Sequence, residues 1–523
     1  MLLDRVKHLE SKPKKIIAFA FVLLLMVRLQ IQIALYQSGF ISLTADEFGR
    51  TIVAARWSQH PVLMDSGSWL PLYSVFIGTA LRFIWELLWV PRVLTILSGI
   101  VVLLAMYRIA AILFDSNLVG LLSAFLLSVN PIYNWLAGTS LTEMPNAMLI
   151  FLAAWAFILY IKTQRLGDLF LSACSLALAN GLRYESWIFS VLFSLTIVGE
   201  WVFALIKRKI QSGNKIMPLI AAAIPWIVPI AWMVGNYVRS GDMLYFARAV
   251  QAYNQKWYAS DISYAKYAET FLKIDPYMTY LGIIAILVCI VLNKKNHAIQ
   301  WYVAIATIPL AVDIILQSGK SEPAGNYIRY LALFAFLFYP AIGYLLVTII
   351  RVIRIKPLKL FLLVFLGVVA FTQLRATFRF ANDPAAPGLA VGLAIRDLRA
   401  QDPEIADQPV IIELTYWQYL AIKVGANDLT RVVYDRVLDT VNRQTQSLLV
   451  ADGALFQSCL KRYQVSYVIV KDSALRGVLE GKLGLKYTRE VNGYAFYPIP
   501  AAWLANIQVD EAGAQCPLAY LSD

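Results

Sequence analysis

The chain has 523 residues, of which 59% are hydrophobic and 15% are charged. A soluble protein carries roughly 25% charged residues, so this composition excludes an ordinary soluble globular protein. Apolar runs such as 16–34 and 332–350 approach the ~20 residues that a helix needs to cross a bilayer. The net charge of +13 is high enough for nucleic-acid binding. The distribution of the basic residues along the chain shows whether they indicate a nucleic-acid partner or the orientation of membrane spans.

The apolar runs predict eleven transmembrane helices. The first follows Lys14 and Lys15 and has no small-residue cleavage site after it, which is typical of a signal anchor. Residues 70–88 are also apolar, but a span there would move every later basic cluster to the outer side, so we expect a juxtamembrane or re-entrant helix. The predicted spans are 16–36, 89–112, 117–134, 144–161, 167–182, 186–206, 216–236, 277–293, 298–316, 329–350 and 358–375.

Charge predicts the orientation of these spans. With the N-terminus inside, the inner segments carry 18 basic and four acidic residues, whereas the outer loops carry 12 and 11. This asymmetry is the positive-inside rule, so the basic excess is an orientation signal and no nucleic-acid partner is expected. We expect a multi-pass protein of the plasma (inner) membrane with a cytoplasmic N-terminus.

The composition changes after residue 375. Residues 376–523 contain 14 basic and 16 acidic residues and no spanning run. Strands are predicted at 409–414 and 465–470, and Asn492-Gly493 predicts a hairpin between 487–491 and 494–497. We therefore expect a mainly α, polytopic transmembrane domain at 1–375, including the outer loop 37–88, and a soluble, extracytoplasmic α/β domain at 376–523. Cys459 and Cys516 lie in this second domain, and the sequence leaves open whether they pair.

Several acids lie at predicted outer positions. Asp46 and Glu47 form an adjacent pair suited to general-base or metal chemistry, but Thr44 and Glu47 also fit a helix capping box. Glu143 lies three residues after Ser140, so the same structural alternative applies to it. Asp313 lies near the outer end of a span, where an acid is either functional or paired with another group.

Arginines also collect at the predicted outer boundary, and guanidinium groups bind phosphate in a bidentate manner. The structural alternative is that they anchor the spans to ordinary lipid headgroups. The chain has no Walker loop, no GxGxxG and no zinc-type cysteine spacing, so the usual nucleotide and metal signatures are missing. These arginines are Arg82, Arg92, Arg183, Arg239 and Arg329.

The order of these motifs resembles the GT-C superfamily of membrane glycosyltransferases, in the branch of protein O-mannosyltransferases and the lipid A aminoarabinose transferase. The resemblance covers most of the chain and rests on the shared side and order of short motifs. They are Asp46-Glu47, Pro71-Leu72, Thr142-Glu-Met-Pro145, Leu182-Arg-Tyr-Glu185, Asn236-Tyr-Val-Arg-Ser-Gly-Asp242, Arg329-Tyr330 and an outer C-terminal domain.

The resemblance implies inverting transfer of a sugar from a polyprenyl-phosphate-sugar donor to a glycan, lipid or protein acceptor on the outer face. Asp46 would be the general base, and Glu47 and Glu143 would orient the acceptor or the sugar. Related oligosaccharyltransferases use a divalent metal and closer relatives do not, so no metal or other cofactor is expected. The implied donor-phosphate residues are Arg329, Tyr330, Arg183 and Arg239, supported by Asp313 and Glu185.

Two departures leave the acceptor class open: Glu143 replaces a frequent Asp, and Trp69-Leu-Pro-Leu72 replaces a His-Pro-Pro-Leu motif. Two other classes of function are also open, a transporter or lipid flippase and a scaffolding subunit. A transporter needs ionisable residues deep in several spans, and a scaffold needs no acids at the outer mouth.

Overall fold

The computed structural model describes residues 14–62, 68–206, 216–257, 263–317, 327–415, 417–436, 446–507 and residue 516. The chain forms two compact units. The first, which we call the helical unit, comprises Met1–Phe40, Val62–Tyr73 and Arg92–Phe380. The second, which we call the α/β unit, comprises Ile41–Pro61, Ser74–Pro91 and Ala381–Asp523. Most of the predicted outer loop 37–88 therefore clusters with the C-terminal part of the chain.

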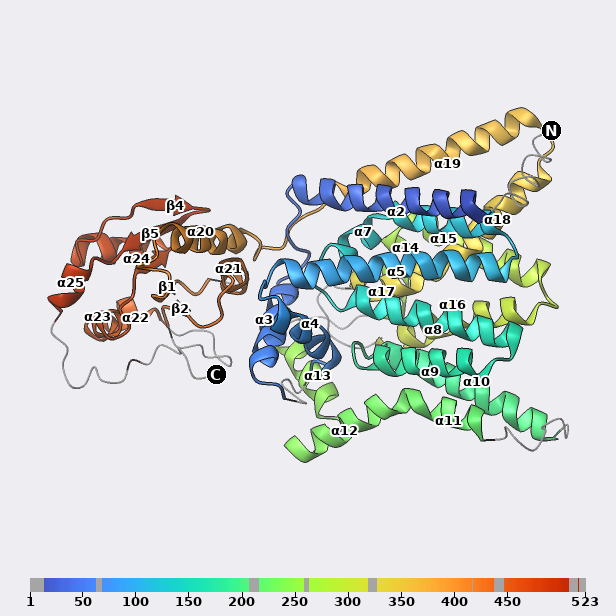
Figure 1. The fold of residues 1–523 in the computed structure, drawn as a ribbon, viewed down its shortest axis with the longest axis horizontal. Helices are drawn as coiled ribbons and strands as arrows, with labels where there is room; N and C mark the ends of the chain where they lie inside the picture. The colour runs from blue at the N-terminus through green and yellow to red at the C-terminus, as the bar shows by residue number, and fades with distance from the viewer. Residues whose placement is uncertain are drawn as a thin grey trace. The chain divides into compact units, whose positions relative to one another are not determined.

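The helical unit is built from long apolar helices, and α5 extends across nearly the whole of it in Figure 1. Its elements are α2 (Lys14–Gln37), α5 (Trp89–Leu113), α6 (Asn117–Ser128), α7 (Pro131–Ala137), α8 (Glu143–Thr163), α9 (Leu166–Asn180), α10 (Ser186–Ile206), α11 (Met217–Ala223), η1 (Ile224–Trp226), α12 (Ile227–Ser240), α13 (Tyr245–Trp257), α14 (Tyr264–Ile274), α15 (Pro276–Leu292), α16 (His297–Gln317), α17 (Tyr327–Phe336), α18 (Tyr339–Val352) and α19 (Lys356–Thr377).

The described residues contain seven helices that are long and apolar enough to cross a membrane, or up to ten if each bent helix pair is one span. Large apolar side chains such as Phe19 on α2 and Phe361 on α19 are exposed, as expected where a helix faces lipid. The protein is therefore a multi-pass membrane protein. The basic segments 1–13 and 207–215, which contribute to the predicted orientation, lie outside the described residues.

Three of the predicted spans differ in length or direction from straight membrane-crossing helices. The helix expected at 167–182 is α9, with 15 residues, and at 1.5 Å per residue it is roughly 22 Å long, less than the ~30 Å hydrocarbon core. The runs 117–134 and 329–350 are not straight spans, because α6 and α7 meet at 72° and α17 and α18 at 46°. A third bend, of 102°, joins α14 to α15. Each bend is followed by a proline at the start of the next helix. A proline disfavours helical geometry at the residue before it, which explains why the helix breaks there.

The α/β unit contains a five-stranded sheet of order β2-β1-β3-β5-β4. Strand β1 is parallel to β2 and β3, whereas β5 is antiparallel to β3 and β4. The two strands and the hairpin predicted from sequence are confirmed, and Asn492 and Gly493 turn the hairpin at φ values of 48° and 80°. Strand β2 was missed. The strands are β1 (Val410–Ile412), β2 (Val432–Tyr434), β3 (Tyr467–Val470), β4 (Arg489–Val491) and β5 (Tyr494–Pro498).

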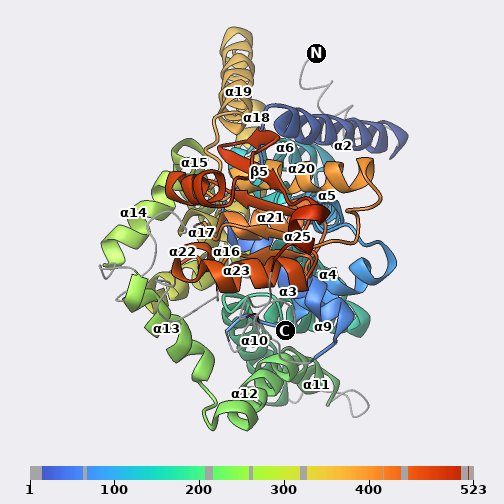
Figure 2. The same ribbon diagram turned by 90° about the vertical axis from the view of Figure 1, so that its left-hand side faces the viewer.

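Helices cover both faces of this sheet, as Figures 1 and 2 show. Val410 and Ile412 pack toward α20 (Pro387–Gln401) and α21 (Gln418–Ala426), whereas Ile411 points to the opposite face. This alternation follows the two-residue period of a strand. The opposite layer is formed by α22 (Leu448–Ala451), α23 (Gly453–Arg462), α24 (Ser473–Gly477), the π-helical turn η2 (Val478–Lys482) and α25 (Ala501–Ala505).

Two helices from the first predicted outer loop complete the α/β unit. Helix α3 (Asp46–Gln59) packs on α21, and α4 (Leu72–Phe83), with 12 residues, is too short to cross a bilayer. Polar contacts fasten the same loop to the C-terminal part of the unit. The Ile41 amide donates to Asn382 Oδ1 at 2.7 Å, the Leu87 amide donates to Asn427 Oδ1 at 2.9 Å, and Arg396 pairs with Glu86 at 2.8 Å.

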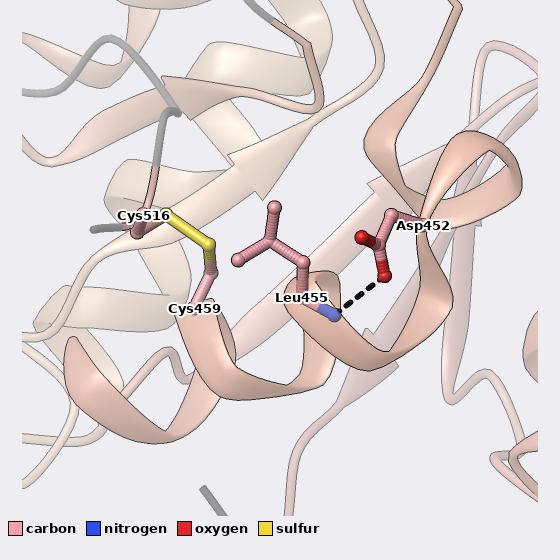
Figure 3. The surroundings of a disulfide bond; sticks show 4 residues. All are labelled: Asp452, Leu455, Cys459 and Cys516. Atoms are coloured by element: carbon pink, nitrogen blue, oxygen red, sulfur yellow. Dashed lines mark hydrogen bonds between the residues drawn. A yellow bond between two sulfur atoms is a disulfide. The ribbon is translucent and has the colours of Figure 1, made fainter. Parts of the chain in front are cut away.

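A disulfide joins Cys459 on α23 to Cys516, the pairing that the sequence left open. Figure 3 shows the bond beside the start of α23, where Asp452 Oδ1 accepts a hydrogen bond from the Leu455 amide at 2.9 Å. The half-cystine at 459 is fully buried in the core between the sheet and its second helical layer. The bond ties residue 516 to that core.

Candidate functional site

Four charged side chains meet in the helical unit. Glu143 is the first residue of α8, Arg183 and Glu185 lie in the turn between α9 and α10, and Arg329 lies in the first turn of α17. Arg183 Nη1 is 2.8 Å from Glu143 Oε1, and Arg183 Nη2 is 2.6 Å from Glu185 Oε1. Arg329 Nε is 3.6 Å from the same Glu143 oxygen. We call these four residues the charged cluster.

The turn that carries Arg183 is held tightly. The Gly181 carbonyl accepts a hydrogen bond from the Leu72 amide at 3.0 Å, and a Cβ at position 181 would lie 2.9 Å from Leu72 Cβ. Tyr184 OH donates to the Ser68 carbonyl, and Tyr73 OH donates to the Ser140 carbonyl. Residues 68–73 therefore support both loops that bring acids and arginine to the cluster.

Tyr330 lies between the two arginines. The Arg183 and Arg329 guanidinium carbons lie 4.7 and 4.9 Å from the centre of its ring. Arg329 Nη2 also donates to Tyr330 OH at 2.9 Å. The ring face attracts cations, so it lets two guanidinium groups lie close together in a site with little water.

The charged cluster lines a cavity with about 300 Å³ of empty space. Asn146, one helical turn after Glu143, also lines it, and its side chain accepts a hydrogen bond from Ser186 at 2.6 Å. Apolar side chains of α7 and α17 close the other side. A second cavity, of about 390 Å³ between α8, α9, α10 and α16, is lined almost entirely by apolar side chains and has no charged group. The residues lining the first cavity are Leu136, Glu143, Asn146, Ala147, Arg183, Glu185, Arg329, Tyr330, Leu333 and Phe336.

Electrostatics keep Arg183 charged. Burial alone would lower the pKa of its guanidinium, but Glu185 and Glu143 outweigh that effect and raise it above its ordinary value. Arg183 also makes two parallel hydrogen bonds to Glu185, from Nε at 3.2 Å and Nη2 at 2.6 Å. Such a bidentate pair fixes the plane of the guanidinium group.

A family model for dolichyl-phosphate-mannose-protein mannosyltransferase matches residues 59–233. The structure of ArnT from Cupriavidus metallidurans bound to undecaprenyl phosphate aligns with a TM-score of 0.57 and 12% identity, over 92% of this chain and 98% of that chain. The apo form of ArnT gives the same values. The chain has the fold of a GT-C membrane glycosyltransferase.

The archaeal oligosaccharyltransferase AglB from Archaeoglobus fulgidus aligns with a TM-score of 0.48 and 14% identity, over 92% of this chain and 75% of that chain. A comparison with curated proteins finds no sequence match. The family match and the fold together indicate a glycosyltransferase, and they favour that class over the transporter and scaffold alternatives.

The structure brings together five of the nine predicted site residues: Glu143, Arg183, Glu185, Arg329 and Tyr330. Two others in the helical unit do not line the cavity. Arg239 lies exposed in the last turn of α12. Asp313 is buried on α16, where it accepts a hydrogen bond from Tyr267 OH at 3.1 Å.

Asp46 and Glu47 lie in the first turn of α3, in the α/β unit. The capping box expected from Thr44 and Glu47 is not formed, because the helix starts later than the pattern predicted. Ala45 is the N-cap residue, without a side-chain bond, and Asp46 begins the helix. Glu47 is fully buried and its Oε1 accepts from the Leu43 amide at 3.2 Å.

The structural alternative for Glu143 was also wrong. Its helix is capped by Thr142, without a side-chain hydrogen bond to the helix, and the carboxylate of Glu143 turns to the arginines. Sequence reasoning missed Asn146, although its spacing of three from Glu143 places both on one helix face. Among the described residues, no group of three or more His, Cys, Asp or Glu side chains is arranged to hold a metal ion.

Proposed function

We propose that this glycosyltransferase moves a sugar, with inversion, from a polyprenyl-phosphate-sugar donor to an acceptor at the outer face of the membrane. The observation that carries the proposal is the pair of buried arginines sharing one cavity with Glu143. The undecaprenyl phosphate bound by ArnT, which shares the fold, supports a donor of this class.

Arg329 is the better candidate for the donor phosphate. Arg183 makes contacts of 2.6 and 2.8 Å to two carboxylates, which fix its guanidinium group on Glu143 and Glu185. Arg329 also lies at the N-terminal end of α17, where the helix dipole is positive and favours an anion. In this proposal Arg183 orients Glu143. Arg239, also expected at the donor phosphate, and Asp313, expected to support it, do not line the cavity.

The chemistry assigned to the acids follows from the reaction. An acceptor hydroxyl must lose its proton as it attacks the sugar, and Asp46 is the proposed general base. Glu47 and Glu143 would orient the acceptor or the sugar. Charge that develops on the leaving phosphate would be stabilised by the fixed guanidinium groups of Arg329 and Arg183.

The disulfide supports an extracytoplasmic α/β unit, because disulfides persist in oxidising compartments and are rare in the cytosol. The positive-inside asymmetry of the sequence points the same way. We therefore expect a periplasmic-type reporter fused after residue 400 to be active, and one fused after residue 165 to be inactive. Activity at residue 165 together with inactivity at residue 400 would reverse the orientation and contradict an outer-face reaction.

The proposed function predicts a lipid phenotype. A strain lacking the protein should accumulate a polyprenyl-phosphate sugar, measured by mass spectrometry of extracted membrane lipids, and the wild-type protein should remove it. Unchanged lipids and glycans in the deletion strain would contradict the proposal.

Arg329→Ala should weaken the binding of undecaprenyl phosphate in nanodiscs. Loss of a charge-assisted contact of about 1.5–3 kcal/mol corresponds to a roughly 10- to 150-fold increase in Kd. Arg248→Ala is the matched control, because Arg248 forms an exposed ion pair with Asp242 and does not line the cavity. Equal affinity in both variants would rule out Arg329 as the phosphate ligand.

A further inference from the structure

The breaks of the three bent spans meet in one buried hydrogen-bonded group. Asn130 lies at the break between α6 and α7, Asp275 between α14 and α15, and Tyr339 starts α18 after the third break. Asn130 Nδ2 donates to Asp275 Oδ2 at 2.8 Å and to Tyr339 OH at 2.9 Å. Gln373 Nε2, on α19, donates to Asp275 Oδ1 at 2.8 Å. We call these four residues the elbow cluster.

Three residues of the elbow cluster share one sequence feature, a proline at the next position. Asn130, Asp275 and Tyr339 each immediately precede a proline. Two of them also start the next helix: Asn130 Oδ1 accepts from the Tyr133 amide at 2.9 Å, and Asp275 Oδ1 accepts from the Met278 amide at 3.3 Å. Asn130 and Asp275 therefore have two roles: each caps the second helix of its bent span, and together they join the two spans by a hydrogen bond.

Two helices lead from the elbow cluster to the cavity of the charged cluster. Helix α7 contributes Leu136 to the cavity, and α17 contributes Tyr330, Leu333 and Phe336. The rings of Tyr133 on α7 and Phe336 on α17 lie 6.0 Å apart, so these two helices pack together. At 1.5 Å per residue, Arg329 lies roughly 15 Å along the chain from Tyr339, so a small shift at the break moves the arginine.

We infer that Asp275 is a positioning residue for donor binding, because it holds the three breaks together and thereby places α7 and α17 around the donor phosphate. The inference rests on the proposed function of the cavity. Asp275 accepts three hydrogen bonds, from Met278, Gln373 and Asn130, and it is buried. The donors are the N-cap residue of α7 and residues of α15 and α19, so the carboxylate joins these three helices at one point.

A substitution that replaces a hydrogen-bond acceptor of Asp275 by a donor tests this role. Asp275→Asn places an amide NH₂ against the Asn130 NH₂, or, if the amide flips, against the donors of Met278 and Gln373. We expect undecaprenyl phosphate to bind roughly 10- to 100-fold more weakly in nanodiscs, because a displaced Arg329 loses most of a charge-assisted contact to the phosphate.

The reciprocal variant Asn130→Asp/Asp275→Asn should recover most of the affinity. The new amide at 275 then donates to the new carboxylate at 130, whose other oxygen still caps the Tyr133 amide. The Tyr339 hydroxyl rotates to donate instead of accept. Ser194→Ala is a control for general loss of polar contacts, because it removes bonds to the Ala222 carbonyl and from the Trp226 indole without touching either cluster. It should lower thermal stability and leave affinity unchanged.

The outcomes separate the inference from the proposed function. If the wild type and Arg329→Ala both fail to bind undecaprenyl phosphate, the proposed function fails and the inference with it. If Arg329→Ala weakens binding while Asp275→Asn binds like the wild type, the inference alone is wrong. Weak binding by Asp275→Asn that the reciprocal variant does not recover would also overturn it, because a positioning role requires that restored hydrogen bonds restore affinity.

Discussion

Asp46→Asn should reduce turnover by roughly 10²- to 10⁴-fold, the usual contribution of general acid–base catalysis. The substitution keeps the size of the side chain and removes only its basicity. Its structural cost should be small, because Asp46 is not the N-cap of α3, and the lost interaction with the helix dipole is about 0.3–1 kcal/mol. Binding of undecaprenyl phosphate should not change, since the carboxylate acts on the acceptor.

The measurement uses the deletion strain, in which each variant is scored by the polyprenyl-phosphate sugar that remains in the membrane. The Asp46→Asn strain should accumulate this lipid as the deletion does. Glu86→Gln is the matched control, because Glu86 is an acid of the same predicted outer loop whose ion-pair partner is Arg396. Normal lipid levels in the Asp46→Asn strain would exclude Asp46 as the base.

Arg183→Met should lower the stability of the protein by about 3–5 kcal/mol, the usual cost of removing one partner of a buried ion pair. The substitution leaves Glu143 and Glu185 buried without the guanidinium that contacts both; their side chains are only 6% and 12% exposed. We therefore expect a marked fall in Tm, measured by thermal unfolding in detergent, together with loss of undecaprenyl phosphate binding.

Two further variants make this prediction specific. Arg183→Met/Glu185→Gln also removes the charge of Glu185, which Arg183 contacts at 2.6 Å, and should recover part of the lost stability. Arg248→Met breaks the contact to Asp242 with a side chain that is 71% exposed, so its cost should be about 0–1 kcal/mol. An Arg183→Met protein as stable as Arg248→Met would show that the charged cluster contributes little to the fold.

The sequence predicted the helical unit well because membrane spans are set by local hydropathy. Most predicted boundaries lie within one or two residues of the observed helices, as for α5 and α10. The bends were missed because a hydropathy run does not register a break in direction. Asn130-Pro131 and Tyr339-Pro340 lay inside predicted spans, and they were the available signal.

Contacts distant in sequence were harder to predict. The residues of the charged cluster were predicted one by one from their places at span ends. Nothing local indicated that Arg183 would contact two carboxylates, or that two guanidinium groups would lie near the Tyr330 ring. Strand β2 was missed because only three residues, Val432–Tyr434, form it. The capping box at Thr44 was predicted but not found. The local pattern is present, but the helix begins at Asp46, so Thr44 is not its N-cap residue.

The way the α/β unit is assembled also limits how the protein can be recombined. Because residues 41–61 and 74–91 belong to that unit, a chimera that exchanges only residues 381–523 with a relative would replace one side of the pairs Ile41–Asn382, Leu87–Asn427 and Glu86–Arg396. Asn382 and Asn427 accept from backbone amides, so a replacement has to keep an acceptor at these positions, whereas Arg396 and Glu86 pair through both side chains and have to be exchanged together. An exchange that preserves these contacts therefore transfers residues 41–61, 74–91 and 381–523 together.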